Sequence, residues 1–170
     1  MITQIINPET TAYYYIAMMI ASLLFVIPQA TTQSLFAEGS YNEKEIKIQI
    51  KKSIKIISAL MISEILITIF FGEYILLLFG QEYLANGLLF LQILAVSGIF
   101  ISINSIFGTL LRVKKRIKNL AAINIFNAVL VLGLGYSLID KGLLGIGISW
   151  ITGCFAVSLI YVLFVRIRKK

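Results

Sequence analysis

The segment "LLRVKKRIKNL" (residues 110–120) packs five basic residues into seven positions between two long apolar runs. The basic residues are Arg112, Lys114, Lys115, Arg116 and Lys118. In a water-soluble protein, such a cluster would indicate a nucleic-acid-binding patch or a localisation signal. Its apolar flanks raise a different interpretation, a cationic turn between two helices that cross a bilayer. The composition of the whole chain distinguishes these possibilities.

The composition is that of an integral membrane protein. The chain is 59% hydrophobic and 14% charged, whereas soluble domains average about 45–50% apolar and about 25% charged residues. A soluble protein of 170 residues would have too little interior to bury so many apolar side chains. The length allows one domain. We therefore expect lipid to surround a single transmembrane domain covering residues 1–170.

Five segments are long and apolar enough to cross a membrane. A hydrocarbon core about 30 Å thick requires a helix of about 20 mostly apolar residues. The segments are 11–36, 54–79, 86–111, 117–138 and 142–165. Because lipid offers no hydrogen-bond partner to the backbone, and because the segments are too long for barrel strands, each should be helical. We predict an all-α fold of five transmembrane helices, with the last four as antiparallel neighbours.

The connection between the first two spans is longer and has its own pattern. Residues 37–53 alternate isoleucines with lysines. This spacing predicts an amphipathic helix that lies on the cytoplasmic membrane surface and leads into the second span.

The distribution of charge predicts the orientation of the chain. With five crossings, every Lys and Arg except Lys141 falls on one side of the membrane. The opposite side has the acids Glu9, Glu73, Glu82 and Asp140. Because cytoplasmic loops carry the Lys and Arg excess, we expect a plasma-membrane protein with its N-terminus outside and its C-terminus in the cytoplasm. The basic run 112–118 is then a topology signal, and nucleic-acid binding is not expected.

The N-terminal segment suggests a longer parent protein. No cleavable signal with a basic region precedes the first span, and an outside N-terminus is more easily explained by a further helix upstream. We therefore expect the chain to be a piece of a longer transporter.

Several kinds of catalysis are excluded by the residues that are missing. The chain has no His, which excludes Ser-His-Asp triads and His-ligated metal sites. Its single cysteine, Cys154, cannot form an intrachain disulfide or a thiolate cage. The glycines are scattered through apolar segments rather than gathered in a phosphate-binding loop. We expect a protein that is not an enzyme and that holds neither a metal nor a cofactor.

The first span contains a candidate hinge. Pro28 removes one helical hydrogen bond and should kink the helix, and the polar residues Gln29 and Gln33 follow it. The kink either serves packing alone or acts as a hinge beside a polar cavity. At the other end of this span, the run Tyr13–Tyr15 is expected at the outer membrane interface.

Glu64 is the one acid well inside a hydrophobic span. A carboxyl group at that depth is costly and by default marks a transport pathway, a proton site or an ion pair. Two structural alternatives remain. Glu64 lies close to the cytoplasmic surface if its span begins near Ser58, or it pairs with Lys55 or Arg112.

The later spans place polar residues on helical faces. Asn104 and Arg112 belong to a small and polar stripe of the third span, and their large side chains make them cavity candidates. Arg112 could equally be a snorkelling anchor. The fourth span adds Asn124 and Asn127, three residues apart. In the fifth span, a ridge of small residues predicts helix packing; its members are Gly145, Ser149 and Gly153.

Three stretches, in their order and spacing, resemble one transporter superfamily. They are "NPETTAYYYIAMMIASLLFVIPQATTQSLFAE" (7–38), "LLLFGQEYLANGLLFLQILAVSG" (76–98) and "KGLLGIGISWITG" (141–153). They resemble polysaccharide and oligosaccharide flippases, whose superfamily includes multidrug exporters of the MATE type, lipid II flippases and O-antigen flippases. The resemblance implies two six-helix halves around a central cavity, with the five spans matching the last five of twelve.

The resemblance also implies a function. The chain would belong to a flippase that exports a lipid-linked oligosaccharide for cell-surface polysaccharide assembly, with membrane lipid around it and a companion transmembrane chain as a possible partner. Arg112 would meet the pyrophosphate of the substrate, and Glu64 would be a coupling or gating acid. The alternatives are a MATE-type drug or cation exporter, which should need acids in its cavity, and a non-transporting membrane scaffold.

Overall fold

The computed structural model describes residues 8–41 and 46–167, which form five long helices and one short turn of 3-10 helix. The elements are α2 (Pro8–Tyr41), α3 (Ile46–Leu77), α4 (Gln81–Val113), α5 (Ile117–Ser137), η1 (Ile139–Lys141) and α6 (Gly142–Ile167). No strand occurs within these residues. All five long helices are long and apolar enough to span a membrane. The predicted all-α fold with five transmembrane helices is confirmed.

The helix ends depart from the expected boundaries at two turns. The span expected to end at residue 79 closes earlier, because Phe79 and Gly80 donate backbone hydrogen bonds to Leu76 and Leu77. Gly80 has φ 127, a conformation that glycine adopts without strain. The connection expected at 37–53 is also different. Residues 37–41 finish α2 and residues 46–53 begin α3, while residues 42–45 lie outside the described residues.

The start of α3 is continuous with its span for a physical reason. Ile50 packs against a buried cluster of Leu35, Ile57, Met61 and Ile106. Ile50 therefore fixes this part of the chain to the helix bundle, and residues 46–53 form the first turns of α3 rather than a separate surface helix.

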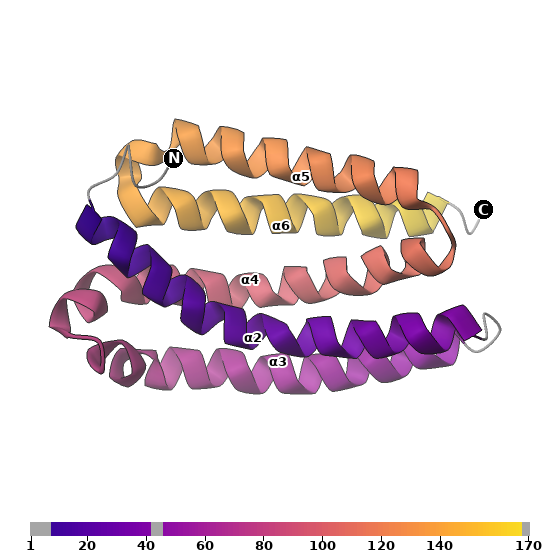
Figure 1. Cartoon of the computed structure of the whole chain (residues 1–170), viewed down its shortest axis with the longest axis horizontal. Coiled ribbons are helices and arrows are strands. Elements are labelled where there is room, and N and C mark those ends of the chain that lie inside the picture. Colours follow the sequence, from indigo (N-terminus) through magenta and orange to yellow (C-terminus); the bar gives the residue numbers. More distant parts are fainter. Residues whose placement is uncertain (1–7, 42–45, 168–170) are drawn as a thin grey trace.

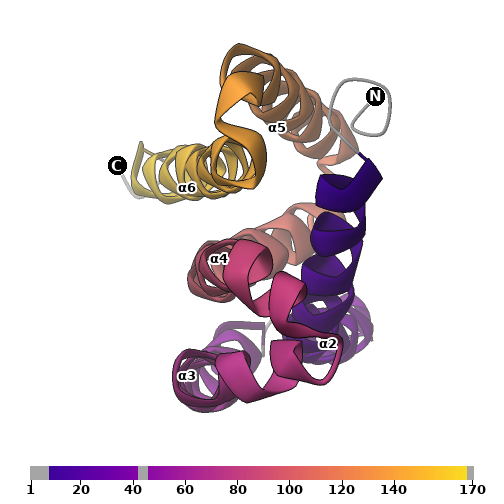
Figure 2. The same ribbon diagram turned by 90° about the vertical axis from the view of Figure 1, so that its left-hand side faces the viewer.

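The helices form two groups joined through α4. Figure 1 shows them lying along the long axis of the molecule, and in Figure 2 the pair α5 and α6 lies above α2, α3 and α4. Helix α4 packs against α2, α3 and α6, whereas α5 packs mainly against α6. The seam between the two groups is thus formed chiefly by α4 and α6.

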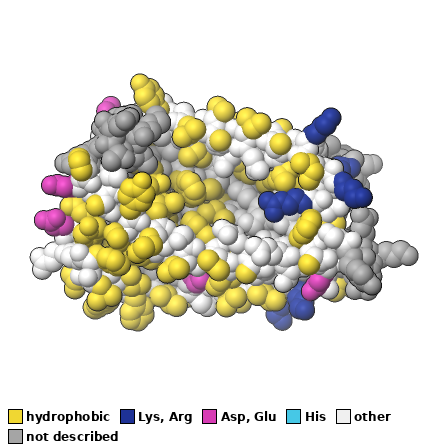
Figure 3. Space-filling view, viewed as in Figure 1, with side chains coloured by type: hydrophobic (Ala, Val, Ile, Leu, Met, Phe, Trp, Pro, Cys, Tyr) yellow, Lys and Arg dark blue, Asp and Glu magenta, His cyan; other side chains and the backbone are white. Residues whose placement is uncertain are grey.

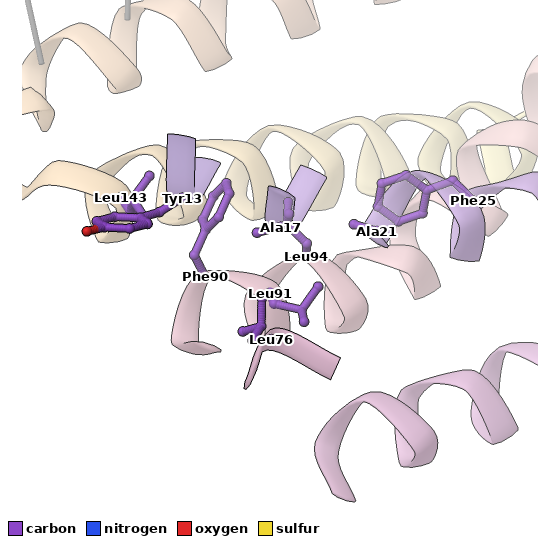
Figure 4. Close-up of a cluster of buried hydrophobic side chains, with 9 residues drawn as sticks. All are labelled: Tyr13, Ala17, Ala21, Phe25, Leu76, Phe90, Leu91, Leu94 and Leu143. Atoms are coloured by element: carbon purple, nitrogen blue, oxygen red, sulfur yellow. The ribbon is translucent and has the colours of Figure 1, made fainter. Parts of the chain in front are cut away.

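A cluster of buried side chains joins α2 to α4 near one end of the molecule (Figure 4). Ala17 and Ala21 of α2 are completely buried, and such small residues allow helices to approach closely. They pack beside Phe90, Leu91 and Leu94 of α4. This contact fixes the α2 backbone close to α4.

The tyrosine run at the start of α2 takes part in packing between helices. Tyr13 is buried and donates a hydrogen bond to a carboxylate oxygen of Glu82 at 3.3 Å. Tyr14 packs its ring on Phe90 at a centroid distance of 5.6 Å. Tyr15 is 63% exposed. The rings of Tyr13 and Tyr14 thus join α2 to α4, and the expected depth of the run at the outer membrane interface stays a prediction.

The ridge of small residues on α6 packs against α5, as its spacing predicts. A side chain at Gly153 would collide with Val131 and Asn127 of α5. Ser149 lies next to Gly135 of α5.

Charged side chains collect at opposite ends of the molecule (Figure 3). One end, called the basic end, has the lysines of early α3 and the α4–α5 turn, accompanied by Glu38. Its described basic residues are Lys51, Lys52, Lys55, Arg112, Lys114, Lys115, Arg116 and Lys118. The other end, the acidic end, has Glu9, Glu73, Glu82 and Asp140 together with Lys141. The antiparallel course of the helices produces this separation, because alternate connections lie at the same end.

Candidate functional site

A cavity of about 670 Å³ lies between α2, α4, α5 and α6. Figure 3 shows a hollow on this face of the molecule, between α5 and α2. No residue of α3 lines it. The cavity therefore lies where the two groups of helices meet.

The lining of the cavity mixes apolar and polar side chains and is almost uncharged. Among the residues that the structure describes, Arg112 is its one basic residue, and no Asp or Glu lines it. Its side-chain amides are Gln29, Gln33, Asn104, Asn124 and Asn127, and its aromatic residues are Phe25, Phe36, Trp150 and Tyr161. Such a surface can donate and accept hydrogen bonds without requiring a charged ligand.

The structure brings six of the eight predicted site residues into this cavity. They are the five amides and Arg112. Pro28 and Glu64 do not line it.

Pro28 lies one residue before the cavity. It is buried in the middle third of α2, which remains helical on both sides of it. Figure 1 shows α2 changing direction part-way along its length, and a proline inside a helix is a common cause of such a bend. Thr32 donates its hydroxyl hydrogen bond to the Pro28 carbonyl at 2.7 Å. The bend directs the following turn, with Gln29 and Gln33, toward the cavity.

Asn104 is both a wall of the cavity and a link between helices. Its side-chain nitrogen donates to the Cys154 carbonyl of α6 at 3.0 Å. The Ser158 hydroxyl lies 2.9 Å from the Asn104 side-chain oxygen and can donate to it. These contacts fix the amide across the α4–α6 seam, so part of its hydrogen-bonding capacity is used by the protein itself.

Two other polar atoms of the cavity wall are buried without a partner. The Oδ1 atom of Asn127 and the Nε1 atom of Trp150 make no hydrogen bond with the protein groups that the structure describes. They lie on neighbouring helices and offer one acceptor and one donor. Leaving such buried atoms unpaired costs about 1–3 kcal/mol each.

Arg112 lies in the last turn of α4, at the basic end of the cavity. Its side chain is exposed. The position is compatible with both interpretations of the sequence, an anion-binding group and a snorkelling anchor.

Glu64 lies apart from the cavity, half-buried on α3. Its Oε2 atom has no hydrogen-bond partner among the described residues. The expected ion pairs with Lys55 and Arg112 are absent from the described part of the chain. Lys55 is nine residues away on the same helix, a rise of about 13.5 Å, and Arg112 faces the cavity. A coupling role for Glu64 stays a prediction.

Two aromatic residues of the cavity were not singled out from the sequence. Trp150 and Tyr161 lie on one stripe of α6 together with Cys154 and Val157. The spacing of four, three and four residues marks a single helical face. The same spacing is typical of ordinary packing stripes, so the sequence alone gave no reason to place them in a site.

The residues that the structure describes contain no group of three or more His, Cys, Asp or Glu side chains able to hold a metal ion.

Five helices able to cross a membrane, with a cavity lined by four of them, define a multi-pass membrane protein of the transporter type. A sequence model of the MatE family matches residues 1–137, which extend to the end of α5. The chain belongs to the MatE family, in the superfamily that contains the MATE-type exporters and flippases. No curated protein and no solved structure matches the chain. Members of the family are transporters rather than enzymes, in agreement with the chemistry that the sequence excludes.

Proposed function

We propose that the chain forms part of a flippase that moves a lipid-linked oligosaccharide outward across the cell membrane for surface polysaccharide assembly. Family membership supports the transporter class. The observation that supports this substrate is the cavity lining, with five side-chain amides, one arginine and no carboxylate.

The lining suits a sugar. A side-chain amide can donate to one hydroxyl and accept from another, and Gln29, Gln33 and Asn124 make no side-chain hydrogen bond that would prevent this in the described structure. Asn127 and Trp150 add an unpaired acceptor and an unpaired donor. The volume of about 670 Å³ lies within the range of about 300–1,000 Å³ that is usual for ligand pockets.

Arg112 suits the pyrophosphate that joins such a sugar to its lipid. A guanidinium group binds phosphate oxygens through two parallel hydrogen bonds. We propose that the basic end faces the cytoplasm, because cytoplasmic loops carry the Lys and Arg excess. The N-terminus would then be outside and the C-terminus inside. Arg112 would meet the phosphate at the inner membrane surface, where the substrate enters.

A drug or cation exporter fits the cavity less well. Binding an organic cation in a low-dielectric site favours a carboxylate nearby, and the cavity has none. Glu64 is on α3, outside the lining. The cavity is open on one face, and further transmembrane helices, in the same polypeptide or a companion chain, would complete it for alternating access.

Trp150 provides a direct test, because it is the one tryptophan of the chain and lines the cavity. The full chain in lipid nanodiscs is titrated with a polyprenyl-pyrophosphate oligosaccharide and, separately, with a lipophilic cation. We expect a saturable change in Trp150 fluorescence with the sugar lipid alone.

Matched variants separate cavity effects from general ones. Asn127→Ala should weaken binding of the sugar lipid about fivefold to tenfold, because it removes one hydrogen bond to a neutral partner. Asn86→Ala should leave the binding unchanged, because Asn86 is an exposed residue of α4 outside the cavity. Arg112→Gln should weaken binding of the pyrophosphate-linked sugar lipid, whereas Lys118→Gln should leave its binding unchanged. Saturable binding of the cation without binding of the sugar lipid would overturn the proposal in favour of the exporter.

A further inference from the structure

A second hollow, of about 380 Å³, lies between α3 and α4 and is separate from the cavity. We call it the isoleucine groove. Its walls include Ile50, Ile54 and Ile62 of α3 and Ile99, Ile103 and Phe107 of α4. No residue of α2, α5 or α6 lines it. In Figure 2, α3 lies below α4 and α2 lies to the right of both, so the groove, which no described residue of α2 lines, faces the surroundings of the bundle.

The dimensions of the groove match one leaflet of a bilayer. It extends along α3 from Ile50 to Ile62, which is about 18 Å at the α-helical rise. Half of the hydrocarbon core is about 15 Å. Its floor contains the buried residues Ile57, Met61 and Ile106, while Ile54 and Ile62 are 46% and 59% exposed at the rim. The groove is therefore open and apolar, and its length along α3 is similar to the thickness of the leaflet that one acyl chain spans.

Among the described residues, lysines flank only the half of the groove that is nearer the basic end. Lys51 and Lys55 are exposed and lie on the same helical face as Ser58 and Ile62, which line the groove. These residues are spaced by four, three and four positions and so share a stripe. Lys114, two turns beyond Phe107, follows the end of α4 at the same basic end. The opposite end of the groove lies among apolar side chains.

We propose that the isoleucine groove is a binding site for one anionic phospholipid. An acyl chain lies along the isoleucines, and the headgroup phosphate contacts Lys51 and Lys55. Apolar contact alone would not distinguish among lipids, since any acyl chain offers the same surface. The charge at the mouth makes the site selective, because basic residues at a membrane surface attract anionic headgroups. This site is independent of the transported substrate.

The test is a lipid titration of the purified full chain in detergent, followed by native mass spectrometry. Phosphatidylglycerol and phosphatidylcholine with identical acyl chains are compared. We expect one phosphatidylglycerol to remain bound and to bind more tightly than phosphatidylcholine. Each lysine changed to glutamine (Lys51→Gln, Lys55→Gln) should cost about fivefold in affinity for phosphatidylglycerol and leave phosphatidylcholine unchanged.

Two control variants match these changes. Lys118→Gln removes the same charge at the same end of the molecule, on α5, which does not contact α3 in the described structure; it should have no effect. Ser58→Trp should block the groove to both lipids, whereas Ser63→Trp, at an exposed position of α3 outside the groove, should not. Circular dichroism checks that each variant is folded. If Ser58→Trp is not folded, the lysine variants alone test whether the groove binds the anionic lipid.

Three results would overturn the proposal. Equal affinity for the two lipids would remove the selective site. Equal losses in Lys118→Gln and Lys51→Gln would indicate a general effect of charge. A dimer that Ser58→Trp converts to a monomer would assign the groove to a second copy of the chain.

Discussion

At the scale of single residues, the polar side chains inside the membrane have two different uses. Asn104 pairs with α6 through Cys154 and Ser158, so it contributes to stability as well as to the cavity wall. Asn127 and Trp150 keep unpaired atoms in that wall. A hydrogen bond between transmembrane helices contributes about 0.6 kcal/mol on average and at most about 1.7 kcal/mol. The two uses can therefore be separated by measuring stability and binding in the same variants.

Asn104→Leu should lower the stability of the folded chain. We expect a loss of about 1 kcal/mol, because the substitution removes the interhelical hydrogen bonds and leaves Ser158 with carbonyl partners alone. The measurement is thermal unfolding in detergent followed by circular dichroism. Asn86→Leu is the control, since the Asn86 amide donates only within α4, to Glu82. Equal stability of the two variants would contradict the role assigned to Asn104.

Single residues also show how much of the cavity could be predicted from the sequence. Asn104, Arg112, Asn124 and Asn127 were predicted as cavity residues because large polar side chains in an apolar span require a partner or water, whereas Gln29 and Gln33 were predicted as polar neighbours of the Pro28 kink. That argument does not distinguish a cavity from another location, and so it also selected Glu64, which lies on α3 outside the cavity. Trp150 and Tyr161 could not be predicted, because an aromatic stripe in a membrane helix also fits packing or lipid contact.

At the scale of elements, the existence of each helix followed from hydropathy, whereas details of the helix ends depended on contacts with other helices. Residues 46–53 show the difference. Their alternating lysines and isoleucines are equally compatible with a surface helix and with the first turns of a long span. Ile50 decides between them by packing on Ile57 and Ile106, a contact with a helix that is distant in sequence. The tyrosine run is similar, because Tyr13 meets Glu82 only after folding.

Gly153→Leu should separate α5 from α6. The added side chain would collide with Val131 and Asn127, and α5 has few other contacts. We expect a destabilisation of several kcal/mol or loss of the folded hairpin, detected by thermal unfolding and by faster proteolysis.

Gly133→Leu is the matched control on α5. No atom lies within contact distance of a side chain added at Gly133, so this variant should unfold at the temperature of the unmodified chain. If both variants were equally stable, the close approach at Gly153 would not be required for the fold.

At the scale of the whole molecule, the separation of charge makes a prediction about orientation. The basic end and the acidic end lie at opposite ends of the bundle (Figure 3). Because the energetic preference for basic loops in the cytoplasm acts on all the connections together, a single orientation should dominate in cells.

Single cysteines introduced at the two ends should report this orientation. An impermeant maleimide should label Glu82→Cys in intact cells and Lys115→Cys only after the membrane is opened. The native Cys154 is buried, so the unmodified chain serves as an unlabelled control. The reverse labelling pattern would contradict the proposed cytoplasmic basic end and, with it, the role of Arg112 on the loading side.

The near-isolation of α5 has a consequence for how the cavity could recognise a ligand. Helix α5 touches the rest of the bundle mainly through α6, so Asn124 and Asn127 belong to the same group of helices as Trp150. The glutamines of α2 belong to the other group, formed by α2, α3 and α4. A displacement of α6 along α4 would change all the distances between cavity residues of the two groups at once. For the sugar ligand proposed above, binding would therefore be adjusted chiefly at the contact between α4 and α6, without a change in the conformation of any individual side chain.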